Sequence, residues 1–219
     1  MQARLEGMAA RSIDTVIFDL GGVLTRNGRH SDFARRFPGA DPEVVTRIIV
    51  GDYGEDGEHP WHRLERGEIT LQENRRLNRD ALAAAGIEVP PAPPGGMQPM
   101  QFEPNVPVIT LVHDLRAAGL RLGVLTNNVA EFRSMWWDLL PFDELFDDLV
   151  DSHEVGMRKP NVAIYQLALA RLGAEAARTA FLDDVPSNVL AAEAVGMLGV
   201  LVDEDPLPAV ATVRRLAGI

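Results

Sequence analysis

The sequence contains no cysteine, which excludes disulfide bonds, thiolate catalysis and cysteine-bound metals together. It also lacks any apolar run near the roughly 20 residues that a bilayer-spanning helix needs, and its N-terminal segment lacks the apolar core of a signal peptide. The net charge of -11 argues against a nucleic-acid partner, because phosphate backbones bind to basic surfaces. We therefore expect a cytoplasmic protein that binds neither nucleic acid nor a membrane.

Lysine is almost absent as well. Of the 21 basic residues, only Lys159 is a lysine, and every other one is an arginine. A chain can retain one lysine by chance, or because a site needs a compact ammonium where a planar guanidinium would not fit. The position of Lys159 relative to the sequence motifs distinguishes these two explanations.

The 219 residues suffice for one α/β domain with a sizeable insertion, or for two small domains. Strand-like runs alternate with amphipathic helical patterns from about residue 107 to 205. This alternation predicts right-handed βαβ units and hence an α/β, Rossmann-like fold with a doubly wound parallel sheet. The predicted strands are residues 14–18, 120–125, 149–151, 179–182 and 199–202.

The first predicted strand is separated from the others by a long helical stretch. Residues 28–88 contain several helical patterns and no good strand, and Asp41 with Pro42 resembles a helix start. The chain then returns through a segment rich in proline and glycine, which cannot form regular structure. We therefore expect a core domain of residues 1–27 and 107–219, and a helical cap domain of residues 28–106 that includes the proline-rich linker.

Polar residues cluster at the ends of the predicted strands and in the loops that follow them. In open parallel sheets, ligands bind at the carboxyl ends of the strands, so these side chains and glycines should converge on one edge. The candidate site residues are Asp19, Gly21, Gly22, Thr126, Asn127, Lys159, Asp183, Asp184 and Asn188.

This set of residues is suited to phosphoryl transfer. Asp19 can attack phosphorus and form an aspartyl phosphate. Asp19 and Asp184, with the backbone carbonyl near Gly21, offer the hard oxygens that Mg²⁺ prefers, and Asp183 can assist them. Lys159 can balance the negative charge of the transferred group.

Four segments, in order, resemble the motifs of the haloacid dehalogenase-like hydrolase superfamily, in its branch with a helical cap after the first strand. They are VIFDLGGVLT (16–25), GVLTNN (123–128), EVGMRKPNVAIYQLAL (154–169) and FLDDVPSNVLAAEAVGM (181–197). The resemblance implies a Mg²⁺-dependent, phosphatase-like hydrolase with Asp19 as nucleophile and Lys159 as charge clamp, so the lysine is retained out of need. It further implies phosphate or substrate contacts by Thr126, Asn127, Gly22 and Asn188.

Gly21 departs from the pattern of the family phosphatases, which usually have an aspartate there as general acid and base. General acid-base catalysis contributes about 10²- to 10⁴-fold to a rate. We therefore expect slow turnover of alkyl phosphates and faster turnover of aryl or acyl phosphates, whose leaving groups need no proton. The alternative is that His30, Arg29 or another cap residue supplies the proton.

Two other functions stay open at this point. In a 2-haloacid dehalogenase-type hydrolase, Asp19 would attack carbon without a metal, and the paired acids Asp183 and Asp184 argue against it. A catalytically weak phosphate-binding or regulatory protein is the second, because Gly21 removes the acid. No substrate can be named beyond a small phosphorylated molecule.

The oligomeric state is equally open, and a monomer or a homodimer is compatible with the sequence. Trp136 and Trp137 are adjacent and cannot both face inward on one helix stripe. One of them is expected at a buried helix edge or at a dimer contact.

Overall fold

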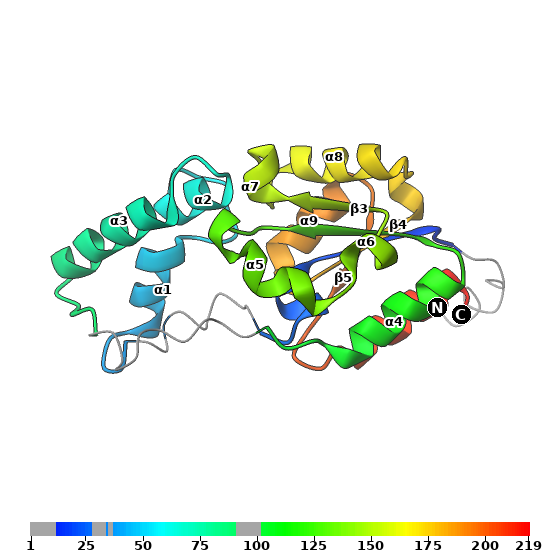
Figure 1. The fold of residues 1–219 in the computed structure, drawn as a ribbon, viewed down its shortest axis with the longest axis horizontal. Coiled ribbons are helices and arrows are strands. Elements are labelled where there is room, and N and C mark those ends of the chain that lie inside the picture. The colour runs from blue at the N-terminus through cyan, green and yellow to red at the C-terminus, as the bar shows by residue number, and fades with distance from the viewer. Residues whose placement is uncertain (1–11, 28–33, 35–36, 91–101) are drawn as a thin grey trace.

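The structure, a computed structural model, describes residues 12–27, 34, 37–90 and 102–219. Its centre is a sheet of five parallel strands in the order β3-β2-β1-β4-β5 (Figure 1). The strands are β1 (Thr15–Phe18), β2 (Arg121–Thr126), β3 (Asp148–Asp151), β4 (Thr179–Asp183) and β5 (Leu198–Leu201). The chain winds from central β1 to one side and later to the other, so the predicted doubly wound sheet is confirmed.

Alternate residues of β1, β2 and β4 face two separate apolar cores, as the period of two in a strand requires. In β1, Val16 and Phe18 pack in the core under α4 and α10, whereas Ile17 packs in the core under α8 and α9. In Figure 1, α4 and α8 lie on opposite sides of the sheet. The covering helices are α4 (Val106–Ala117), α8 (Val162–Leu172), α9 (Pro186–Ala194) and α10 (Leu207–Ala217).

Three helices lie beyond the carboxyl edge of the sheet, on the left in Figure 1. They are α1 (Pro42–Val50), α2 (Pro60–Glu65) and α3 (Leu71–Ala84), and we call the described residues 37–90 the insert. The helix α1 starts as predicted, because Asp41 accepts a 2.9 Å hydrogen bond from the backbone N–H of Glu43 and Pro42 is the first helical residue. The insert has its own small core, which includes Trp61 and Leu64 and extends onto Val129 after β2.

The chain leaves the sheet and returns to it along two adjacent segments. Thr25 and Pro104 form an antiparallel bridge, and the N–H of Arg26 donates to the carbonyl of Glu103 at 2.8 Å. These segments lie near the predicted boundaries of the cap. The division into core and cap domains itself stays a prediction.

Short elements complete the fold. They are η2 (Leu20–Leu24), η4 (Ala130–Phe132), α5 (Arg133–Trp136), η5 (Trp137–Leu139), α6 (Phe142–Leu145), α7 (Ser152–Val155) and η6 (Ala176–Arg178). No helix in the described part of the chain is both long and apolar enough to cross a bilayer.

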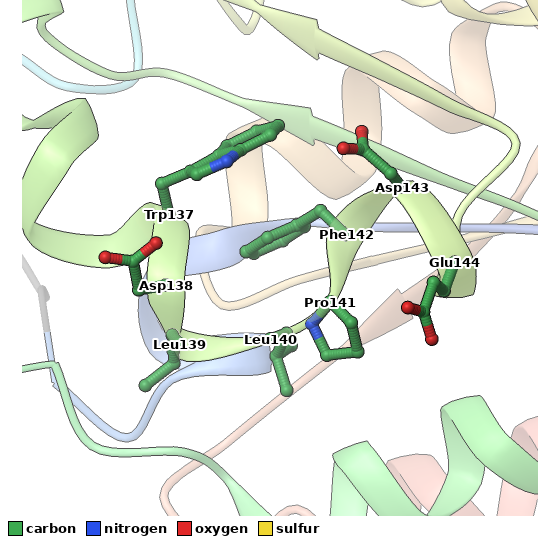
Figure 2. A pocket seen from close by; sticks show the side chains of 8 residues that line it. All are labelled: Trp137, Asp138, Leu139, Leu140, Pro141, Phe142, Asp143 and Glu144. Atoms are coloured by element: carbon green, nitrogen blue, oxygen red, sulfur yellow. The ribbon is translucent and has the colours of Figure 1, made fainter.

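The tryptophan pair divides between the core and the surface. Trp136 is fully buried, whereas Trp137 is half-buried and stacks on Phe142 with ring centroids 5.5 Å apart (Figure 2). Trp137 packs at the edge of the same apolar core as Trp136, which corresponds to the buried helix edge among the two expected positions. Around Trp137, residues 137–144 line a shallow pocket of about 400 Å³ with acidic side chains at its rim (Figure 2).

Candidate active site

Three carboxylates meet at the carboxyl edge of the sheet. Asp19 directly follows β1, and Asp183 is the last residue of neighbouring β4, where Phe18 is level with Leu182. Each of Asp19, Asp183 and Asp184 offers one oxygen, and these atoms lie within 4.8 Å of one another. The convergence predicted from strand ends therefore holds for the acids.

Lys159 joins this group from the loop between α7 and α8. Its Nζ lies 2.9 Å from Oδ1 of Asp19 and 2.6 Å from Oδ2 of Asp183, and the residue is only 1% exposed. Burial alone would lower the pKa of Lys159, but the two carboxylates outweigh it and raise that pKa. The ammonium is therefore charged and shared by two acids.

Burial lowers the pKa of a lysine but raises the pKa of a carboxyl group, such as that of the nucleophile candidate Asp19. Desolvation raises the pKa of the Asp19 carboxyl to about 7, although the neighbouring Lys159 charge acts to lower it. The charges of Asp183 and Asp184 add to the increase. A cation between these acids would relieve the cost of ionising them.

Asp183 is held by more than the lysine. Its Oδ1 accepts a 2.8 Å hydrogen bond from the N–H of Val185, and Asn188 Nδ2 donates to both carboxylate oxygens at 3.1 and 3.2 Å. The carbonyl of Asn188 in turn accepts from the Tyr165 hydroxyl at 2.9 Å. The amide N–H group of Asn188 thus orients Asp183, and its contact with phosphate stays a prediction.

The two glycines after Asp19 have different backbone conformations. Gly21 has φ -71° and ψ 126°, which any residue can adopt, whereas Gly22 has φ +75° in the left-handed region. A Cβ on Gly22 would lie 2.5 Å from Oδ2 of Asp184. Conformation and space therefore both favour glycine at Gly22, whereas the backbone conformation of Gly21 does not require glycine.

At the end of β2, Thr126 is buried and Asn127 holds the lysine loop. The Asn127 side chain accepts from the Lys159 N–H at 2.8 Å and donates to the Lys159 carbonyl at 3.0 Å. It also donates to the hydroxyl of Tyr53 in the insert, at 3.3 Å. The phosphate contacts expected of Thr126, Asn127 and Gly22 stay predictions.

Sequence reasoning missed a buried ion pair beside the site. Arg158, the neighbour of Lys159, is fully buried, and its Nε donates to Oε2 of Glu65 in α2 at 2.8 Å. Only an indirect sign of this pair was present in the sequence. Glu65 lies in the predicted helical stretch 28–88, and Arg158 lies in the motif segment 154–169. The two suggested proton donors, His30 and Arg29, lie outside the described residues.

A sequence model of the haloacid dehalogenase-like hydrolases matches residues 13–196. The chain belongs to this family of hydrolases. The sesquiterpene phosphatase astK of Aspergillus oryzae is 30% identical over 208 residues, which cover 92% of this chain and 95% of that protein. The glyceraldehyde 3-phosphate phosphatase of Methanocaldococcus jannaschii is 31% identical over 199 residues, which cover 86% of this chain and 84% of that protein.

Solved structures agree on the fold of this hydrolase. A dehalogenase in an intermediate complex gives a TM-score of 0.66 at 17% identity, covering 96% of this chain and 99% of that one. A family enzyme of Bacteroides thetaiotaomicron, in complex with magnesium and inorganic phosphate, gives a TM-score of 0.57 at 18% identity. The match covers 88% of this chain and 96% of that one. At such identities the likeness extends to the fold alone.

Proposed function

We propose that this hydrolase is a cytoplasmic, Mg²⁺-dependent phosphatase that cleaves phosphate monoesters of small molecules through an aspartyl-phosphate intermediate. One observation carries the proposal: three carboxylates lie within 4.8 Å of one another, and one of them, Asp19, is 2.9 Å from the Lys159 ammonium. Both relatives named above are called phosphatases, which supports this choice within the family.

The donor set fits a magnesium ion. Mg²⁺ prefers hard oxygen ligands, usually one or two carboxylates together with water and phosphate oxygens. Asp19 and Asp184, with the Gly21 carbonyl, would hold the ion, and Asp183 would assist from its fixed position beside Lys159. When bound, the ion would neutralise charge between the anionic nucleophile and the anionic phosphate.

The side chains then divide the reaction between them. A carboxylate oxygen of Asp19 attacks phosphorus, the bond from phosphorus to the leaving oxygen breaks, and that oxygen keeps the electron pair. Lys159 balances the negative charge near the attacking oxygen. Water subsequently hydrolyses the aspartyl phosphate, which releases inorganic phosphate and restores the Asp19 carboxylate.

Gly21 makes the rate depend on the leaving group. It offers no side chain to protonate the departing oxygen, so an alkoxide leaving group is disfavoured by about 10²- to 10⁴-fold compared with an enzyme that has the acid. Aryl and acyl phosphates do not need this proton. We expect the purified protein with Mg²⁺ to turn over these activated phosphates faster than alkyl phosphates of similar size, and equal rates would contradict this part of the proposal.

The phosphatase itself is tested with an aryl phosphate. We expect turnover that is abolished by Asp19→Asn and by chelation of the metal, and unchanged in Asp143→Asn, which alters an exposed acid at the rim of the pocket in Figure 2. Chloride release from a 2-haloacid without metal would favour the dehalogenase instead. Phosphate binding without turnover of any phosphate ester would favour a binding or regulatory role.

Gly21→Asp provides a gain-of-function test. Any residue can adopt the backbone conformation of Gly21, so aspartate should cause no backbone strain there. We expect this variant to raise the rate on alkyl phosphates and to leave the rate on aryl phosphates within a few-fold. A variant that binds Mg²⁺ normally and gains nothing would show that another group already supplies the proton.

A further inference from the structure

The buried ion pair between Glu65 and Arg158 joins the insert to the loop of the catalytic lysine. The two residues are 93 positions apart in the sequence, and each is at most 1% exposed. A charge pair removed from water in this way needs further hydrogen bonds to its remaining atoms, and of these only Nη2 of Arg158 has no hydrogen-bond partner among the described residues. The partners of those atoms therefore indicate what the pair holds in place.

All of these partners come from the insert. Oε1 of Glu65 accepts from Trp61 Nε1 at 2.8 Å and from the Tyr53 hydroxyl at 3.1 Å. Nη1 of Arg158 donates to the backbone carbonyl of Glu55. The guanidinium also lies over the Tyr53 ring, 4.9 Å from its centroid. The Arg158 side chain is thus held by residues of the insert. The backbone of Arg158 lies outside the insert, in the part of the chain that forms the sheet and its covering helices, which we call the sheet domain.

Tyr53 extends the network to the other side of the lysine. Its hydroxyl accepts from Asn127 Nδ2 at 3.3 Å, and the Asn127 amide group holds both the N–H and the carbonyl of Lys159. Arg158 precedes Lys159 directly in the chain. The backbone of Lys159 is therefore fixed by two groups, Arg158 and Asn127, and each of them contacts the insert.

We propose that Glu65 and Tyr53 are positioning residues, which hold Lys159 against Asp19 when the insert is docked on the sheet domain. This inference rests on the proposed function, because it assigns the role of the insert in that same reaction. Docking of the insert would then complete the charge arrangement at Asp19, where Lys159 Nζ lies 2.9 Å away, in addition to covering the substrate.

A second bridge between the insert and the sheet domain provides a matched control. Asp56 accepts from Asn161 Nδ2 at 3.0 Å and pairs with Arg66 at 2.6 Å. No hydrogen bond or ion pair described above joins Asp56 to Glu65, Tyr53 or Asn127. A variant at Asp56 therefore weakens docking at Asn161, where the lysine loop leads into α8, while the groups that hold the Lys159 backbone keep their contacts.

The experiment compares Glu65→Gln and Tyr53→Phe with Asp56→Asn in the full chain. Turnover of an aryl phosphate with Mg²⁺ gives kcat and KM, and hydrogen exchange followed by mass spectrometry gives the protection of the peptide that contains Lys159. We expect the first two variants to lower kcat roughly 10- to 100-fold, with KM within about threefold, and to accelerate exchange at that peptide. Asp56→Asn should leave both quantities within about twofold.

Three results would overturn the inference. They are an equal loss of kcat in Glu65→Gln and Asp56→Asn, unchanged exchange at the Lys159 peptide in Tyr53→Phe, or an effect confined to KM. If Glu65→Gln does not fold, Tyr53→Phe decides alone, because it keeps the ring under the guanidinium. If the wild-type chain hydrolyses no phosphate ester, the proposed function fails, while the exchange measurement still tests whether the insert holds the lysine.

Discussion

A Cβ atom on Gly22 would lie 2.5 Å from Oδ2 of Asp184, a separation that real Cβ atoms essentially never show. The two residues are distant in sequence, and each belongs to a different predicted motif of the site. The backbone after β1 is therefore shaped around a carboxylate that follows β4, and a side chain at Gly22 would displace a predicted metal ligand.

Gly22→Ala should for this reason impair metal binding more than it impairs folding. The left-handed backbone makes alanine unfavourable by about 1–2 kcal/mol, and the clash with Asp184 comes in addition. Gly119→Ala is the control, because Gly119 has nearly the same φ, +73°, and nothing within 4 Å of the added atom. We expect Gly22→Ala to lose at least as much stability as Gly119→Ala in urea unfolding, while only Gly22→Ala loses about tenfold or more in Mg²⁺ affinity by titration calorimetry. Equal Mg²⁺ affinities in the two variants would refute this.

The sheet and the acid cluster were predictable because they depend on local signals and one topological rule. Each strand was predicted to within one residue at either end, since short segments rich in apolar residues and bounded by turns define them. The rule that parallel strands end at one edge then brought Asp19 to Asp183 without any knowledge of contacts. Lys159 followed from its rarity and its motif.

The network around the lysine could not be predicted in this way. Glu65 and Arg158 are ordinary charged residues in their own segments, and their pairing depends on how the insert docks. The predicted contact of Asn127 with phosphate or substrate gave no sign that its side chain holds the backbone of Lys159 and reaches Tyr53. Sequence patterns report which face of an element is buried, but not which two polar groups from distant segments meet there.

Removal of the lysine should expose the repulsion between the acids. Lys159→Met leaves Asp19 and Asp183 buried without their shared cation, and breaking a buried pair costs about 3–5 kcal/mol. Because burial raises the pKa of Asp19, that carboxyl takes up a proton as the pH falls. The loss should therefore be smaller at pH 5.5 than at pH 8, as measured by urea unfolding in the presence of chelator.

The control for this variant is an exposed pair of similar geometry. Arg178 lies 2.7 Å from Asp14, with both side chains about 40% exposed (44% and 39%). Water screens the attraction within an exposed pair, so Arg178→Met should cost far less than Lys159→Met. Similar losses in the two variants would mean that the ammonium is not held in a buried site.

Magnesium affinity should depend on pH through Asp19. Its pKa is raised above the ordinary value to about 7 in the metal-free protein, so the carboxyl is protonated below that pH and must release a proton to bind the ion. Affinity should accordingly fall by up to about tenfold per pH unit as the pH decreases below 7. Calorimetry in two buffers of different ionisation enthalpy should detect release of up to one proton at pH 6 and almost none at pH 8. Asp19→Asn should abolish this proton release, and an affinity that stays constant from pH 5.5 to pH 8 would contradict the assignment.

The titration of His153, which lies away from the acid cluster, should change the free energy of unfolding. The hydrogen bond between His153 Nδ1 and Asp151 Oδ1, at 2.7 Å, raises the pKa of His153, and the charges of Asp151 and Glu154 raise it further. Burial and the nearby Arg133 oppose the increase. Because the folded-state pKa exceeds the unfolded value near 6.5, the stabilisation is complete below that pH and is lost as the pH rises through the folded value.

His153→Gln separates this charge from the hydrogen bond, because glutamine keeps a neutral donor for Asp151. We expect the variant to lose clearly more stability at pH 5.5 than at pH 9, because the stabilisation by the charge is lost as the pH rises through the folded-state pKa. His113→Gln, at an exposed position in α4, serves as the control substitution. Urea unfolding at both pH values measures the free energies of unfolding. If the loss in His153→Gln were the same at both, His153 would stabilise the end of β3 by packing and hydrogen bonding rather than by its charge.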